Sequence, residues 1–271
     1  MTRVGSDPGH RTATPAALWL PASVGVAFLV LPLAALLARA PWRTLPAHLA
    51  GPVVRTALRL SLVSATAATA VSLLLGVPLA WVLARSSFRG KRLLRALVTV
   101  PLVLPPVVGG VALLLAFGRR GVIGRLLDSW FGVSLPFSTA AVVLAEAFVA
   151  MPFLVIAVEG ALHGVDRRYE EAAVVLGASR WEVFRRVTLP LMAPGVAAGA
   201  MLCWARALGE FGATITFAGS YPGRTETVPI AAYLALESDV DGAVALSLVL
   251  LAVSVLVLVG LRGRWVSGAI G

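Results

Sequence analysis

The chain contains little charge and almost no cysteine or lysine. Charged residues make up 13% of its 271 residues, against roughly 25% in average soluble proteins. The single cysteine, Cys203, excludes a disulfide within the chain, and its apolar neighbours indicate a packing residue. The one lysine, Lys91, is followed by Arg92. The phosphate-binding pattern G-x-x-x-x-G-K-[ST] is therefore missing, and the chain cannot hydrolyse ATP by that route.

Motifs for other chemistry are also missing. The sequence contains no G-x-S-x-G, H-E-x-x-H or paired-cysteine pattern. The three histidines, His10, His48 and His163, are too far apart in sequence to suggest metal-ligand spacing. We therefore expect no catalytic residue, no metal and no cofactor bound by this chain.

Apolar sequence, in contrast, is abundant. Hydrophobic residues make up 59% of the chain and the mean hydropathy is +0.91, which predicts an all-α integral membrane protein. The net charge of +10 would suit nucleic acid, but the basic residues stand in short clusters between apolar runs. That pattern is typical of cytoplasmic loops facing anionic lipid, so we expect membrane lipid and no nucleic acid as a partner.

Six apolar segments are predicted to span the membrane. The first is too long for the core of a secretory signal peptide, which is the alternative interpretation. The third contains Pro101, Pro105 and Pro106, which predict a kinked helix. The predicted spans are residues 16–38, 60–84, 96–117, 139–158, 189–217 and 243–261.

The basic clusters predict how these spans are oriented. More Lys and Arg residues lie in the segments that share a side with the N-terminus, so both termini are expected in the cytoplasm. The predicted divisions are a disordered tail (1–15), a first helix with its extracytoplasmic connection (16–54), a transmembrane domain (55–262) and a C-terminal tail (263–271). The loop at 218–242 is then extracytoplasmic.

Residues 166–190, the longest polar stretch, are predicted to form two short cytoplasmic helices. Asp166 is an N-cap candidate for the first, and Gly177 is a natural residue just past its end. Ser179 and Glu182 form the S-x-x-E capping box that starts the second. The stretch separates the fourth and fifth spans.

Three charged residues fall inside predicted spans: Glu146, Arg206 and Glu210. Each costs about 2.5–3.5 kcal/mol at a helix centre, so such residues mark an internal pair or a pathway. Arg206 and Glu210 are four residues apart and can form an ion pair that either fixes packing or lines a cavity, where Arg206 attracts an anion and Glu210 orients or gates it. Thr214 and Thr216 either donate to a substrate or bond back to their own helix. The sequence does not predict the partner of Glu146.

The polar stretch resembles the EAA motif of bacterial ABC importer permeases. The pattern is E-A-A, three residues, G, nine residues, an aliphatic residue, one residue and L-P. The resemblance covers about residues 55–262 and implies the type I importer fold, with 166–190 as the coupling element that docks on a separate ATPase subunit. The alternative is an amphipathic helix lying on lipid. The matching positions are Glu171, Ala172, Ala173, Gly177, Val187, Leu189 and Pro190.

A second stretch, R-A-L-G-E-F-G-A at 206–213 with residues 217–233 after it, resembles the molybdate branch of these permeases and, more weakly, the sulfate/thiosulfate branch. The resemblance implies a permease subunit of an ATP-driven importer for molybdate, with sulfate, thiosulfate or tungstate as alternatives. The implied partners are two ABC ATPase subunits that use ATP and Mg, an extracytoplasmic oxyanion-binding protein and a second copy of the chain in a homodimer. The implied location is the bacterial plasma membrane. An ion-driven secondary transporter is the remaining alternative, but the sequence has no convincing internal repeat.

Overall fold

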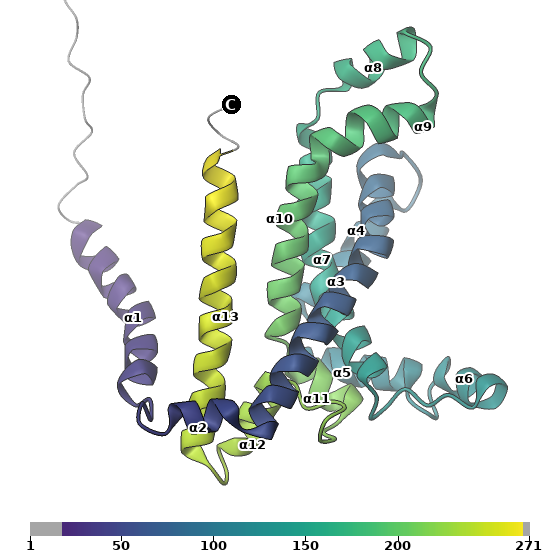
Figure 1. Ribbon diagram of the computed structural model, residues 1–271. Coiled ribbons are helices and arrows are strands. Elements are labelled where there is room, and N and C mark those ends of the chain that lie inside the picture. The colour runs from purple at the N-terminus through teal and green to yellow at the C-terminus, as the bar shows by residue number, and fades with distance from the viewer. Residues whose placement is uncertain (1–17, 268–271) are drawn as a thin grey trace, which may run out of the picture.

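The computed structural model describes residues 18–267, and every regular element in that range is helical (Figure 1). Five helices are long and apolar enough to cross a membrane, or six when a bent pair counts as one span. The predicted all-α membrane fold is therefore confirmed. The tail predicted at residues 1–15 lies outside the described residues, as do the last four residues of the tail predicted at 263–271.

Long helices alternate with short ones along the chain. The long helices that pass singly as spans correspond to the predicted first, second, fourth, fifth and sixth spans. They are α1 (Trp19–Ala38), α3 (Pro52–Arg85), α7 (Thr139–Gly164), α10 (Leu189–Leu208) and α13 (Val240–Ser267). The shorter elements are α2 (Leu45–Ala50), α4 (Lys91–Val103), α5 (Pro106–Phe117), α6 (Gly124–Phe131), α8 (Arg167–Val175), α9 (Arg180–Val183), the π-helix η2 (Phe184–Thr188), α11 (Gly212–Ala218) and α12 (Val228–Ala235).

The core lies between α3, α7 and α10, and small residues bring these helices close together. Gly199 on α10 is buried, and a Cβ added there would lie 2.8 Å from the Cβ of Ala157 on α7. A Cβ at Gly195, one turn earlier, would clash with Ala161. Without a hydrophobic driving force between helices in lipid, such close approach supplies the packing energy.

The third predicted span is broken rather than kinked. Helices α4 and α5 meet at 118°, because Leu104 and Pro105 between them are extended and interrupt the helix. A residue that precedes proline is disfavoured from the helical region, and Leu104 precedes Pro105 while Pro105 precedes Pro106. The prolines were recognised in the sequence, but the prediction of a single kinked helix was wrong.

The fifth predicted span, 189–217, is also interrupted. Helix α10 ends at Leu208, and α11 begins only at Gly212. The intervening residues therefore leave the helical path within the predicted span. Three further helices, α2, α6 and α12, lie in segments that the sequence predicted as connections.

The short helices gather at the two ends of the bundle (Figure 1). Helices α8 and α9 lie at the same end as the start of α1 and the end of α13, whereas α2, α6, α11 and α12 lie toward the opposite end. Helix α1 stands apart from the core and has no buried residue. Short helices and their connections thus lie at both ends of the bundle of long helices.

Candidate functional site

The 166–190 stretch folds as the two predicted helices with the predicted caps. Asp166 accepts a hydrogen bond from the backbone N–H of Arg168 at 3.0 Å. The Ser179 hydroxyl accepts from the N–H of Glu182 at 3.3 Å, and the Glu182 carboxylate accepts from the N–H of Ser179 at 2.9 Å, which completes the capping box. These bonds fix the chain at both helix starts.

Gly177 separates α8 from α9 through its backbone conformation. Its φ is +89°, in the left-handed region that favours glycine, and a Cβ added there would meet nothing within 4 Å. Glycine is therefore required by the turn and not by crowding within the chain. The turn reverses the chain direction, so that α8 contacts both α9 and η2.

The tip of this stretch exposes apolar side chains. Val175 and Leu176 are each 86% exposed, Trp181 is exposed as well, and no residue of α8 is buried. Within the EAA-like positions, Glu171 and Ala172 are exposed and Ala173 is half-buried. Such an apolar patch at the end of a chain segment is typical of a protein-interaction surface.

The second helix of the stretch runs into α10 without a break. Helix α9 continues through the π-helix η2, and α10 begins at Leu189 with Pro190 in its first turn. Val187 is half-buried, whereas Leu189 and Pro190 are exposed. A displacement of α9 is therefore passed along a continuous helical path into a core helix.

Sequence reasoning missed the acidic residue that holds this stretch to the core. Glu170, not Glu171, contacts other elements: its Oε1 accepts hydrogen bonds from Arg85 Nη2 and from the Thr188 hydroxyl, each at 2.8 Å. Arg85 and Thr188 lie 85 and 18 residues away in the sequence. No local spacing rule relates these three positions, so only the fold reveals the contact.

At the end of α10, within the fifth predicted span, the structure forms the predicted ion pair between Arg206 and Glu210. Arg206 Nη2 lies 2.6 Å from Glu210 Oε2. The Glu210 side chain is 1% exposed and that of Arg206 is 28% exposed. Glu210 Oε1 also accepts from the N–H of Ala213 at 2.9 Å, so the carboxylate joins the end of α10 to the start of α11 across the helix break. This arrangement buries the carboxylate of Glu210 and leaves the Arg206 side chain partly exposed.

The other predicted pathway residues lie on the helices around this break. Glu146 on α7 is buried and accepts from the Ser64 hydroxyl at 2.8 Å, while its Oε2 has no partner among the described residues. Thr216 donates back to the carbonyl of Gly212 at 2.7 Å. Thr214 is buried, and its hydroxyl has no partner in the described part of the chain. The structure thus gives Thr216 the helix-internal alternative and identifies Ser64 as the partner of Glu146.

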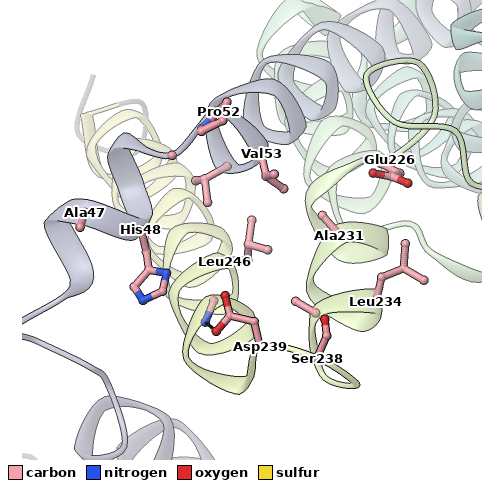
Figure 2. A pocket seen from close by; sticks show the side chains of 14 residues that line it. Ala47, His48, Pro52, Val53, Glu226, Ala231, Leu234, Ser238, Asp239 and Leu246 are labelled. Carbon is pink, nitrogen blue, oxygen red and sulfur yellow. Dashed lines mark hydrogen bonds between the residues drawn. The ribbon is translucent and has the colours of Figure 1, made fainter.

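A pocket of about 520 Å³ lies at the opposite end from α8, between α2, the start of α3, α12 and α13 (Figure 2). His48, Glu226 and Asp239 contribute its ionisable side chains. Asp239 caps the N–H of Gly242 at 2.9 Å, and Glu226 accepts from the Ser220 hydroxyl at 2.7 Å. Two carboxylates disfavour an anion in this pocket, which leaves Arg206 as the better candidate for anion contact.

Between residues 18 and 267, no group of three or more His, Cys, Asp or Glu side chains gathers to hold a metal ion.

Comparison with known proteins gives a consistent set of relatives. Residues 72–267 match the family described as "Binding-protein-dependent transport system inner membrane component". The chain is 52% identical over 253 residues to the molybdenum transport system permease protein ModB of Mycobacterium tuberculosis, covering 93% of this chain and 96% of that protein. It is 35% identical over 238 residues to the probable sulfate transport system permease protein of Chlorokybus atmophyticus, covering 86% and 83%. A crystal structure of a bacterial alginate ABC transporter in complex with an alginate-bound periplasmic protein matches with a TM-score of 0.69 at 18% identity, over 90% of this chain and 91% of that one.

Proposed function

Because the chain belongs to the family of binding-protein-dependent transport system inner membrane components, the permease subunits of ABC importers, we propose that it carries molybdate across the membrane. The sequence relationship favours this oxyanion: the relative named for molybdenum is 52% identical, and the relative named for sulfate is 35% identical. The structural observation that supports an anion is the partly exposed Arg206 at the break between α10 and α11.

The arginine suits a tetrahedral dianion for geometric reasons. A guanidinium presents N–H donors in a planar fork that matches two oxygens of an oxyanion, and it keeps its charge at every physiological pH. Arg206 Nη2 lies 2.6 Å from Glu210, and the arginine side chain remains 28% exposed. In this proposal Arg206 attracts the anion, and Glu210 orients the guanidinium and neutralises it between transport cycles.

The 166–190 stretch supplies the connection to ATP hydrolysis. We assign its apolar tip and the EAA-like positions Glu171, Ala172, Ala173 and Gly177 to docking on a partner ATPase that binds ATP and Mg. The exposed Val175 and Leu176 supply apolar area for this docking. The α8 end then faces the cytoplasm, and the α12 end faces the binding protein that delivers the anion.

A full transporter in this proposal contains two copies of the chain, two ATPase subunits and one extracytoplasmic binding protein. Helix α1 and the outer face of α3 expose apolar side chains that lipid or a second copy would cover, including Leu31, Leu74 and Leu75. ATP-driven closure of the ATPases moves the two coupling elements, and the continuous path from α9 to α10 carries that movement to Arg206.

Reconstitution tests the substrate. The chain is purified with its ATPase and binding protein, placed in proteoliposomes and supplied with ATP and labelled molybdate. We expect ATP-dependent uptake of labelled molybdate that excess unlabelled molybdate or tungstate abolishes and that excess sulfate reduces much less.

Arg206→Ala should lower uptake at least tenfold. Arg206→Lys should retain part of the uptake, because lysine keeps the charge but lacks the planar pair of N–H donors.

Asp128→Asn on α6 is the matched control for removing an ion pair. Asp128 forms an exposed pair with Arg119 at 3.3 Å, which is worth little in water, so uptake should stay at the wild-type level. Uptake of sulfate that excess molybdate does not reduce would assign the protein to sulfate transport. Uptake that continues without the ATPase subunit, driven by an ion gradient, would reject the importer assignment.

A further inference from the structure

Helix α8 has no core of its own that would hold it in place. None of its residues is buried, and it is joined to α7 and α9 through the non-helical residues 165–166 and 176–179. A helix attached in this way pivots about its connections when a partner pushes on it. For a movement of α8 to reach the membrane-spanning helices, α8 must contact them through at least one side chain.

Glu170 provides the contact between α8 and two core elements. Its Oε1 accepts from Arg85 Nη2, at the last residue of α3, and from the hydroxyl of Thr188, at the last residue of η2. The side chains of Arg85 and Glu170 are 14% and 21% exposed, and Thr188 is fully buried. Because these groups are shielded from water, the ion pair is screened much less than the exposed pairs of this protein.

Aromatic packing joins the same two elements beside this contact. The guanidinium of Arg85 lies over the Trp81 ring at 5.9 Å from its centroid. Trp81 packs edge-on against Phe184, the first residue of η2, at a centroid distance of 5.0 Å. Arg85 is therefore fixed by a ring from α3 that itself contacts η2, so its fork points at Glu170 before any partner binds.

Glu170 supplies the counter-charge for the largely buried guanidinium of Arg85. The Nε of Arg85 is buried and has no hydrogen-bond partner in the described part of the chain. Removing the carboxylate would leave a largely buried cation without its counter-charge, which is the costly way to break such a pair. Replacing only the charge with an amide retains a hydrogen-bond acceptor for both donors.

We propose that Glu170, Arg85 and Thr188 form a latch that ties α8 to the cytoplasmic ends of both α3 and α10. This proposal rests on the proposed coupling function of the 166–190 stretch. A push on α8 then moves α3 as well as α10, so the two core helices shift together. Glu170 is a positioning residue: it does not touch the transported anion, and the exposed Glu171 beside it is the residue left for the ATPase.

Two readouts on the assembled complex in lipid nanodiscs and proteoliposomes test the latch. The first is hydrogen exchange of α8 amides without nucleotide, which needs no substrate. The second is the number of anions carried per ATP hydrolysed. Glu170→Ala should speed α8 exchange about tenfold while α7 exchange stays unchanged, and it should lower anions per ATP at least fivefold while basal ATP hydrolysis remains.

Milder substitutions keep the test decisive. Glu170→Gln keeps an acceptor for both donors but leaves Arg85 without its counter-charge, so it should retain part of the coupling, more than Glu170→Ala does. Thr188→Val, which removes one hydroxyl without changing charge, should also give an intermediate effect, even if Glu170→Ala fails to accumulate. Asp128→Asn, at an exposed ion pair on α6, should match the wild type in both readouts.

Three results would overturn the latch. They are wild-type exchange and coupling in both Glu170→Ala and Thr188→Val, faster exchange throughout α3, α7 and α10, or coupling in Glu170→Gln that is no higher than in Glu170→Ala. Failure of the proposed function looks different: the wild-type complex itself would carry no molybdate, while hydrogen exchange would still report on the latch.

Discussion

At the scale of single residues, some functional positions are set by local backbone geometry and others by contacts between residues far apart in the sequence. Glu170 and Glu171 are adjacent and chemically identical, yet one is bonded to two other elements and the other is exposed. Gly177 is required by its φ and not by space. Sequence pattern identifies a position such as Gly177, because turn chemistry is local. It cannot separate Glu170 from Glu171, because their difference depends on Arg85, 85 residues away.

Gly177→Ala should uncouple the transporter without unfolding it. An alanine in the left-handed region costs about 1–2 kcal/mol, and the turn between α8 and α9 would relieve that strain by moving the apolar tip. We expect uptake in proteoliposomes to fall several-fold while the chain still accumulates in the membrane. Gly132→Ala is the matched control. Gly132 also has a positive φ, of +63°, and open space around its Cα, but it lies just after α6 and outside the coupling stretch. Equal losses in both variants would contradict a role specific to the coupling turn.

Glu146→Gln should leave stability nearly unchanged, whereas Glu146→Ala should lower it. The amide oxygen of glutamine can still accept from Ser64, as Glu146 Oε1 does at 2.8 Å. Alanine removes that acceptor and opens a cavity in a fully buried position, at a cost of about 1–3 kcal/mol for the lost polar contact. Thermal melting of the purified protein in detergent measures both. A large drop for the glutamine variant would show that the negative charge of Glu146 itself is structural.

At the scale of helices, the candidate anion-contact residues lie at an interruption of an apolar segment. The interruption between α10 and α11 places Glu210 where it can bond both Arg206 and the N–H of Ala213. Hydropathy over 189–217 predicted one span, because the break at Gly209–Phe211 contains neither proline nor a run of polar residues. The break between α4 and α5 was signalled by its prolines, although composition does not give an angle of 118°. The order of the five singly spanning helices was thus predictable, and the interruptions only in part.

The approach of α7 and α10 gives a prediction at this scale. Gly199→Ala should destabilise the core by a few degrees in melting temperature, because the added Cβ would lie 2.8 Å from that of Ala157. Ala157→Gly in the same chain should restore much of the loss. Gly160→Ala, on the same helix as Ala157 but with open space around its Cβ, serves as control and should be neutral or slightly stabilising. Destabilisation that Ala157→Gly fails to relieve would show that this contact is not the cause.

At the scale of the whole molecule, the two ends of the bundle differ in the partners that they suit. The α8 end carries the exposed apolar tip, and the latch connects this end to the core. The other end carries α12 and a pocket with two carboxylates. The break beside Arg206 follows the last turn of α10, toward the end opposite α8 (Figure 1), so a movement that starts at α8 reaches the candidate anion contact through the length of α10. The basic clusters predict that the α8 end faces the cytoplasm.

Cysteine labelling from either side of the membrane tests that orientation directly. The natural Cys203 is fully buried and should not react in the folded protein, so single added cysteines report their own position. We expect Val175→Cys, at the exposed tip of α8, to react with a membrane-impermeant maleimide only after the cells are opened. Tyr221→Cys, exposed after α11, should react in intact spheroplasts. Trp130→Cys, exposed on α6, provides a second outside position. Labelling of Val175→Cys in intact spheroplasts would reverse the orientation and remove the ATPase-docking assignment, because ATP is available only inside the cell.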